Sequence, residues 1–242
     1  MTRPTLLLVP GLLCDAAVWA SLRPALELRV DILVADHGTL DSLAAMAARV
    51  LESAPARFAI AGHSMGGRVA FEVLRLAPER VAGLALLDTA CHPLARGAVG
   101  EQERHGRLAL LATARRAGMR AMAREWVQGM VHPARLGDAA LIDAILDMFE
   151  RTTPDIFAAQ IHALLSRPDA CGLLEDIRCP TLVLCGAQDS WSLPQGHRDM
   201  AAAIRGSMLS LIDDCGHMAP MEKPAQVSAA LATWLARLQL GA

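Results

Sequence analysis

The chain has 242 residues, of which 53% are hydrophobic, and this is enough to build one large α/β domain or two small ones. Its 23 Lys and Arg residues against 25 Asp and Glu residues leave a formal net charge of -2, so no overall basic field is available to hold a nucleic-acid backbone. The composition therefore argues against a disordered chain and against a nucleic-acid partner.

The beginning of the chain predicts a strand and a turn rather than a targeting segment. Arg3 and the apolar run 6–13 loosely resemble a secretory signal, but Pro10 and Gly11 interrupt the run and no A-x-A-like cleavage site follows. No apolar stretch approaches the roughly 20 residues that a membrane-spanning helix requires. We therefore expect a cytoplasmic protein with no membrane partner.

Short apolar runs alternate with helical patterns along the chain. The predicted strands are residues 5–9, 31–35, 57–61, 82–87, 181–185 and 208–212, and the predicted amphipathic helices are residues 40–53, 66–76, 195–204 and 225–238. This alternation is typical of a compact, mostly parallel sheet of about six strands with helices on both faces. We expect a single α/β domain that spans residues 1–242.

The strand signal is absent between about residues 92 and 169, where one helical pattern follows another. Asp138 is placed to cap a helix that ends at Glu150, and Thr153 before Pro154 is placed to begin the next. Strands of the sheet precede and follow this segment. We interpret it as a helical cap inserted into the single domain.

Gly62-His63-Ser64-Met65-Gly66 lies between a predicted strand and a predicted helix and matches the pattern G-x-S-x-G. The sharp turn forces the serine into strained backbone angles, and glycines on either side avoid collisions with the adjoining elements. Ser64 is thereby exposed as a candidate nucleophile, and the N–H of Met65 at the start of the helix can face an oxyanion. The alternative interpretation is a serine that merely caps the helix.

A serine hydroxyl is a weak nucleophile at neutral pH, so it needs a base and a carboxylate that orients the base. Asp189 follows the predicted strand 181–185, and His217 follows the predicted strand 208–212. Both emerge at the carboxyl edge of the sheet, where Ser64 also emerges, and the order Ser, Asp, His fits this arrangement. Asp88, after the strand 82–87, is the alternative acid.

The segment Val9-Pro10-Gly11-Leu12-Leu13 follows the first predicted strand directly. Acyl transfer needs a second hydrogen-bond donor for the oxyanion. We expect the N–H of Leu12 to supply it, beside the N–H of Met65.

These motifs resemble the α/β-hydrolase superfamily over nearly the whole chain. The resemblance rests on Gly62-His63-Ser64-Met65-Gly66-Gly67, on the run 177–186 that leads to Asp189, and on Gly216-His217 followed by Glu222-Lys223-Pro224. The chain is most similar to the small bacterial carboxylesterases that include the pimeloyl-acyl-carrier-protein methyl ester esterases, with heme-free haloperoxidases as near relatives. Members usually carry His-Gly in the loop where Pro10-Gly11 stands here.

The resemblance implies a carboxylesterase-type serine hydrolase that acts on a small-molecule ester. Ser64 would attack the ester, His217 would move the proton and Asp189 would orient His217, with no metal and no organic cofactor. Thioester cleavage and carbon–carbon bond hydrolysis by the same residues are the alternatives within catalysis. A non-catalytic ligand-binding protein on the same fold is the alternative outside it.

Two groups of side chains in the cap segment, one basic and one apolar, indicate what the protein binds. Arg116, Arg120 and Arg124 are spaced four apart, so one helix would carry them on one face, where an acidic carrier protein or a solvated surface is expected. The apolar positions expected to pack the cap and line the substrate pocket are Met119, Met122 and Trp126.

The six cysteines are scattered without C-x-x-C spacing in a chain that is not short. They are Cys14, Cys91, Cys171, Cys179, Cys185 and Cys215. We interpret them as small buried hydrophobic residues rather than disulfide partners or metal ligands.

Overall fold

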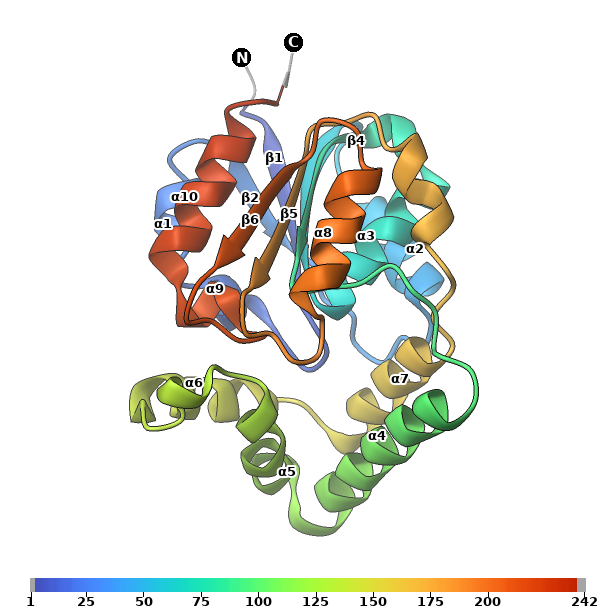
Figure 1. Cartoon of the computed structure of the whole chain (residues 1–242), viewed down its shortest axis with the longest axis vertical. Helices are drawn as coiled ribbons and strands as arrows, with labels where there is room; N and C mark the ends of the chain where they lie inside the picture. Colours follow the sequence, from blue (N-terminus) through green and yellow to red (C-terminus); the bar gives the residue numbers. More distant parts are fainter. Residues whose placement is uncertain (1–2, 239–242) are drawn as a thin grey trace.

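The computed structural model describes residues 3–238 of the chain. Six parallel strands form one sheet in the order β2-β1-β3-β4-β5-β6 (Figure 1). The strands are β1 (Thr5–Val9), β2 (Asp31–Val34), β3 (Phe58–His63), β4 (Val81–Leu87), β5 (Thr181–Gly186) and β6 (Met208–Ile212). The predicted parallel sheet is therefore confirmed.

Helices cover both faces of the sheet. On one face lie α1 (Arg23–Leu26) and α10 (Pro224–Leu235), and on the other lie α2 (Leu43–Ser53), α3 (Met65–Leu76) and α8 (Pro194–Ala203) (Figure 1). The connections contain α9 (Ala219–Glu222) and the 3-10 turns η1 (Ala16–Trp19), η2 (Pro78–Arg80) and η5 (Cys171–Asp176). None of the helices between residues 3 and 238 combines the length and the apolar character needed to cross a bilayer.

The burial of each strand explains its place in the sheet. All residues of β3, β4 and β5 are buried, and β1 is buried from Leu6 onward, as expected for strands covered on both faces. The edge strands β2 and β6 contain exposed positions, among them Leu33 and Leu209. The continuous apolar runs of the sequence thus mark the central strands.

Several predicted boundaries shift by one to three residues in the structure, among them the end of α10 at Leu235 rather than at residue 238, and two of the shifts have a plain structural cause. Strand β3 extends to His63, two residues beyond the predicted end, because its ladder with β4 continues to the pair His63–Leu87. Helix α2 begins at Leu43 rather than at residue 40, because the hydroxyl of Ser42 caps it by accepting a hydrogen bond from the N–H of Ala45 at 3.2 Å.

The segment expected to be a cap lies between β4 and β5 and is called here the helical insertion (residues 92–169). It contains α4 (Ala98–Ala117), α5 (Met119–Trp126), η3 (Val127–Gly129), η4 (Pro133–Arg135), α6 (Ala139–Glu150) and α7 (Pro154–Leu165). These helices lie beyond the carboxyl ends of the strands (Figure 1). Asp138 and Thr153 cap α6 and α7, as the sequence predicts.

The prediction that one helix face carries three arginines is wrong. Gly118, with a φ of 89°, separates α4 from α5, so Arg116 lies on one helix while Arg120 and Arg124 lie on the next. The Arg120 guanidinium forms ion pairs with three carboxylates of α6, those of Asp143, Asp147 and Glu150. Its charge therefore holds two helices of the insertion together.

The interpretation of all six cysteines as unbonded is also wrong, because Cys91 and Cys171 form a disulfide. Cys91 follows β4 and Cys171 begins η5, which follows the insertion, so the bond joins the two ends of the helical insertion. The N–H of Ala170 also donates to the carbonyl of Cys91 at 3.0 Å. A separation of 80 residues hides such a pair from any local pattern.

The two glycines beside Ser64 lie where other chain segments approach closely. A Cβ on Gly62 would come within 2.3 Å of the carbonyl oxygen of Gly66, and a Cβ on Gly66 would come within 2.0 Å of the carbonyl oxygen of Val9. The first turn of α3 therefore packs directly against the loop that follows β1.

We predict that Gly66→Ala lowers the free energy of unfolding by about 3 kcal/mol, because the added methyl group has no space between two backbone segments. Denaturant unfolding measures this loss. The matched control is Gly196→Ala in α8, where an added methyl group would meet no other element within 4 Å. That variant should be at least as stable as the parent, and an equal loss in both variants would contradict the packing argument.

Candidate active site

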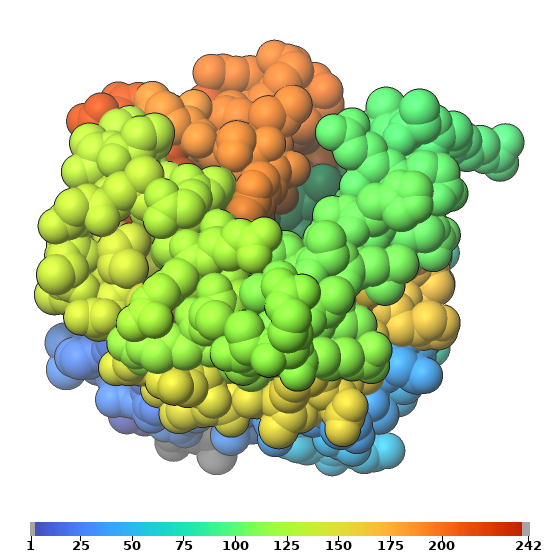
Figure 2. Space-filling view, turned by 90° about the horizontal axis from the view of Figure 1, so that it is seen from below, coloured from blue at the N-terminus to red at the C-terminus, as the bar shows by residue number. Residues whose placement is uncertain are grey.

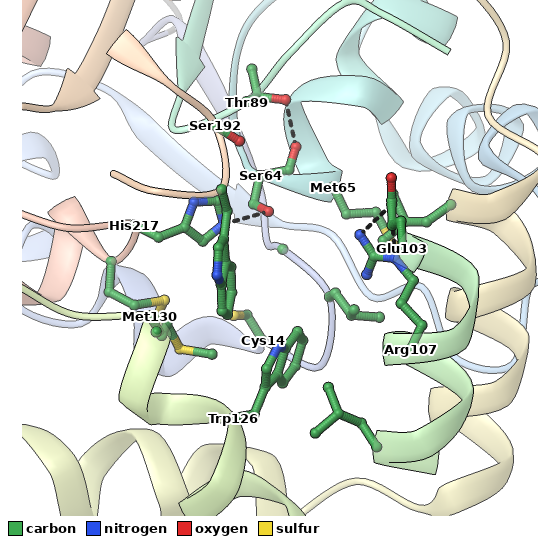
Figure 3. Close-up of a pocket in the computed structure, with 18 of the residues that line it drawn as sticks. Cys14, Ser64, Met65, Thr89, Glu103, Arg107, Trp126, Met130, Ser192 and His217 are labelled. Atoms are coloured by element: carbon green, nitrogen blue, oxygen red, sulfur yellow. Dashed lines mark hydrogen bonds and ion pairs between the residues drawn. The ribbon is translucent and has the colours of Figure 1, made fainter. Parts of the chain in front are cut away.

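Ser64 occupies a strained turn between β3 and α3. Its φ of 54° and ψ of -116° lie outside the regions that residues with a side chain ordinarily adopt. Two hydrogen bonds hold the turn: the Ser64 N–H donates to the carbonyl of Leu87 at 2.9 Å, and the Thr89 hydroxyl donates to the carbonyl of Ser64 at 2.7 Å (Figure 3). The end of β4 thus fixes the backbone that presents the hydroxyl.

The imidazole of His217 lies between Ser64 and Asp189, as the sequence predicts. Its Nε2 lies 2.9 Å from Ser64 Oγ (Figure 3). Its Nδ1 lies 2.8 Å from Asp189 Oδ2. The Nδ1–H that donates to the carboxylate leaves Nε2 free to accept the hydroxyl proton. Three loops, after β3, β5 and β6, supply these side chains.

Asp189 is held by its own loop as well as by His217. Its Oδ1 accepts hydrogen bonds from the N–H groups of Trp191 at 2.8 Å and Ser192 at 3.0 Å. Burial raises the pKa of a carboxyl group, but here the charge and hydrogen bond of His217 outweigh it and hold the pKa of Asp189 below its usual range. The buried carboxylate is therefore ionised at neutral pH.

Asp88, the alternative acid, does not reach the His217 ring. Its Oδ1 accepts from the N–H of Gly186 at 2.9 Å, and its Oδ2 lies 3.7 Å from His63 Nε2. Burial, together with the negative charge of Asp189, raises the pKa of Asp88 well above its usual range. The geometry therefore selects Asp189 as the partner of His217.

His63 supports the loop that carries His217. Its Nε2–H donates to the carbonyl of His217 at 2.8 Å. Burial, with a smaller contribution from the nearby His217, lowers the pKa of the His63 imidazole from 6.5 to about 3. This ring therefore stays neutral and serves as a structural donor.

The loop after β1 lies against Ser64. A Cβ on Gly11 would come within 3.2 Å of Ser64 Cβ, and within the described chain neither the Leu12 N–H nor the Met65 N–H has a protein acceptor. Leu13 adopts a φ of 59°, and its N–H donates to Oε1 of Gln160 at 2.8 Å. A residue of α7 therefore holds the turn from which the expected oxyanion donor projects.

Glu222 connects the loop of His217 to the helical insertion. One carboxylate oxygen accepts from the N–H groups of Gly216 at 3.0 Å and Met218 at 3.2 Å, and the other accepts from the N–H of His132 at 2.7 Å. The N–H of His217 itself donates to the carbonyl of Met130 at 2.8 Å. The insertion thus fixes the position of the imidazole.

A cavity of about 670 Å³ opens beside Ser64. Seen from the insertion, the surface is hollowed between α4, in green, and the segment around α8, in orange (Figure 2). One side of the cavity is largely apolar and is lined by Leu12, Cys14, Leu110, Trp126, Met130, Phe149 and Trp191. The other side carries charged groups of α3, α4 and the end of the insertion (Figure 3).

Of the three residues predicted to line the pocket, one does so and two do not. Trp126 lines the cavity and stacks on Trp191 with ring centroids 5.3 Å apart, and Trp191 in turn lies 4.9 Å from the His217 ring. Met119 and Met122 are buried in the insertion and do not line the cavity. The helical period identified their apolar character but not which face of α5 meets the cavity.

Several supporting residues carried no recognisable signal in the sequence. Gln160, Thr89 and Trp191 act through contacts with residues far along the chain, and the N–H of Thr89 is itself held by Nε2 of His197 at 3.0 Å. Glu222 is the exception, since it belongs to the Glu222-Lys223-Pro224 run that the sequence singles out.

Two groups of side chains within residues 3–238 bring three metal-ligating atoms together. In the first, two of the atoms, the sulfurs of Cys91 and Cys171, are joined as a disulfide beside His92. In the second, Asp88 and Cys185 lie near Asp189, whose carboxylate is engaged by His217. Neither group offers a free set of ligands, so we assign no metal to them.

The chain is similar to known proteins in sequence and in fold. Residues 6–230 match the alpha/beta hydrolase family. The chain is 27% identical over 238 residues to the pimeloyl-(acyl-carrier protein) methyl ester esterase of Aromatoleum aromaticum, covering 93% of this chain and 95% of that protein. A malate-bound thermophilic esterase from Thermogutta terrifontis matches with a TM-score of 0.85 and 29% identity, covering 97% of this chain and 90% of that one. The enol-lactonase from Burkholderia xenovorans LB400 shares the fold with a TM-score of 0.83 and 22% identity, covering 98% and 92%.

We predict that Gln160→Met lowers the turnover of any substrate processed at Ser64 by about tenfold and the free energy of unfolding by about 1–3 kcal/mol, because it leaves the buried N–H of Leu13 unpaired. Steady-state kinetics and denaturant unfolding measure the two effects. Gln195→Met, on the exposed side of α8, is the control and should change neither. Unchanged turnover in the Gln160 variant would show that α7 does not hold the loop.

We predict that stability falls on acidification below pH 6.5, partly because of His63. The unfolded chain binds a proton at this histidine below pH 6.5, whereas the folded chain does not until about pH 3, so each pH unit in that window costs about 1.4 kcal/mol. His63→Gln keeps a donor for the His217 carbonyl and should make the slope shallower by about that amount. Urea unfolding between pH 4.5 and 7 measures the slope.

The control for this titration is His105→Gln, which replaces an exposed imidazole on α4. It should leave the slope as it is in the parent protein. Equal slopes in the His63 variant and the parent would contradict the assignment of a neutral, buried ring.

Proposed function

Because the chain belongs to the alpha/beta hydrolase family and is similar to esterases of that family, we propose that it cleaves a carboxylic ester through an acyl-enzyme formed on Ser64. The observation that carries this proposal is the row of two short contacts, Ser64 Oγ to His217 Nε2 at 2.9 Å and His217 Nδ1 to Asp189 Oδ2 at 2.8 Å. A nucleophile, a base and an orienting carboxylate in that order are what acyl transfer to a hydroxyl requires.

In the first half of the reaction, Ser64 Oγ attacks the ester carbonyl while His217 Nε2 takes its proton. The carbonyl oxygen becomes an oxyanion that accepts hydrogen bonds from the N–H groups of Leu12 and Met65. The imidazolium is stabilised by Asp189, which stays ionised. His217 then gives the proton to the leaving alcohol as the ester bond breaks, and the acyl group remains on Ser64.

In the second half, His217 removes a proton from a water molecule, whose oxygen attacks the acyl carbon. The same two N–H groups hold the second oxyanion. His217 returns the proton to Ser64 Oγ as the acyl–serine bond breaks, and the carboxylic acid leaves. His217 thus acts as base and acid in each half, with the net consumption of one water molecule.

The substrate is a small-molecule ester that enters the cavity beside Ser64. The likeness to an esterase that acts on a pimeloyl group attached to acyl-carrier protein supports the idea of an acidic carrier as an additional partner. Arg120 is not a free cation for such a carrier, since α6 supplies three carboxylates to it. Arg115 and Arg116, exposed at the end of α4, and Arg124, exposed on α5, are candidates for this role.

We predict that Ser64→Ala lowers the turnover of p-nitrophenyl acetate and butyrate by about 10⁴-fold or more, because the acyl-enzyme is no longer formed. Initial rates and circular dichroism measure activity and folding in the same preparation. A fluorophosphonate probe should label the parent protein at Ser64 and leave the variant unlabelled.

The control is Ser228→Ala on α10, a helix that lines no part of the cavity. Its turnover and labelling should match those of the parent. Undiminished ester turnover in Ser64→Ala would reject the nucleophile. Absence of both turnover and labelling in the parent would favour a binding protein on this fold.

A further inference from the structure

Four charged side chains form the side of the cavity opposite its apolar wall. Arg107 and Glu103 lie on successive turns of α4, Arg167 follows α7, and Arg68 lies on α3. Figure 3 shows Glu103 and Arg107 on the Met65 side of Ser64, away from Trp126 and Met130. This group, Arg68, Glu103, Arg107 and Arg167, is called the arginine cluster below.

The single carboxylate of the cluster is already shared by two of its arginines. Glu103 accepts two hydrogen bonds from Arg167, both at 2.8 Å, and one from Nε of Arg107 at 2.9 Å. The charges and hydrogen bonds of these two arginines outweigh the cost of desolvation and lower the pKa of Glu103 to about 2. Glu103 is therefore ionised and saturated by its partners.

Arg68 has no such partner. Its guanidinium donates to the backbone carbonyl of His92 at 2.8 Å, and among residues 3–238 no carboxylate forms an ion pair with it. Glu125, the other acidic residue of the cavity lining, lies on α5 beside Trp126 and is likewise absent from the ion pairs of the described chain. Burial, together with the charge of Arg167, lowers the pKa of Arg68 to about 9.

A partly buried cation beside other cations is unfavourable unless an anion joins it. Three guanidinium groups against one carboxylate leave two positive charges without a counter-ion at this end of the cavity. Planar guanidinium groups bind carboxylates through paired hydrogen bonds. The cluster therefore has the composition of a carboxylate-binding site that lacks its ligand.

Helix α3 links the arginine cluster to Ser64. Arg68 follows Ser64 by four residues, one turn along α3, and helical side chains lean toward the N-terminus of their helix. The Arg68 guanidinium reaches the carbonyl of His92, and both Arg68 and Ser64 line the same cavity. One molecule in the cavity can contact both.

We propose that the arginine cluster is a subsite for a carboxylate carried by the substrate, so that the preferred substrate is an ester with an ionised carboxyl group a few bonds from the scissile carbonyl. This inference rests on the proposed function, since it places that carboxylate relative to an ester at Ser64. The apolar wall around Trp126 and Trp191 then contacts the uncharged part of the substrate, and Arg68 contacts the carboxylate.

Paired substrates test the subsite. The first series is the monomethyl esters of succinic, glutaric, adipic and pimelic acids, each compared with the methyl ester of the monocarboxylic acid of equal chain length. The second series places the charge on the alcohol side, with acetoxyacetate compared with ethyl acetate. We expect kcat/KM to be at least tenfold higher for the charged member of at least one pair.

Arg68→Met removes the charge and keeps much of the length of the side chain. It should reduce the charged-to-neutral ratio of kcat/KM by about 10- to 100-fold, the effect of losing a hydrogen bond to a charged group, while neutral esters keep their turnover. That retained turnover also shows that the variant folds. Arg68→Lys should keep part of the preference, and Arg205→Met, which changes an exposed arginine outside the cavity lining, should keep all of it.

Ratios near one in every pair, or a preference that survives in Arg68→Met, would overturn the subsite while leaving the esterase intact. Binding separates the two proposals if turnover fails. Calorimetry with Ser64→Ala should detect monomethyl glutarate or a longer homologue, and the double variant with Arg68→Met should not bind it. Equal binding by both proteins, or none by either, would reject the subsite whatever the reaction at Ser64.

Discussion

The position of one imidazole ring governs this site. His217 must keep Nε2 at the hydroxyl of Ser64 and Nδ1 at the carboxylate of Asp189, and the distances of 2.9 and 2.8 Å leave little freedom for the ring. Its backbone is accordingly held on two sides, with the N–H bonded to Met130 and the carbonyl to His63. The strained turn can present Ser64 Oγ to a base, and the cavity can place a substrate beside it, only when this ring is held in position.

Two buried carboxyl groups lie close together beneath the site, and the structure separates their charge states. Asp189 faces an imidazole and two backbone N–H groups, which favour its ionised form. Asp88 accepts from the N–H of Gly186 but faces no cation, and burial favours its neutral form. One negative charge therefore faces His217 from below, which is the amount that an imidazolium can neutralise.

The sequence predicted the parts of the site that a local pattern marks. Ser64, Asp189 and His217 each follow an apolar run, and parallel strands bring their carboxyl ends to one edge, so their convergence follows from strand direction. The bond between Gln160 and Leu13, the Cys91–Cys171 disulfide and the burial of Met119 depend on how distant segments pack, which periodicity does not encode. Gly118 divided a predicted helix because a positive φ ends it locally.

The helical insertion both walls the cavity and bonds to the loops that carry the reacting groups. Gln160 and the carbonyl of Met130 are acceptors from the insertion for N–H groups of Leu13 and His217. Divergence toward a new substrate is therefore free to alter the side chains of α4 that face the cavity, but drift at these two contacts would slow every substrate alike. In this architecture, selectivity and rate can evolve independently only where the insertion does not touch the loops of the sheet.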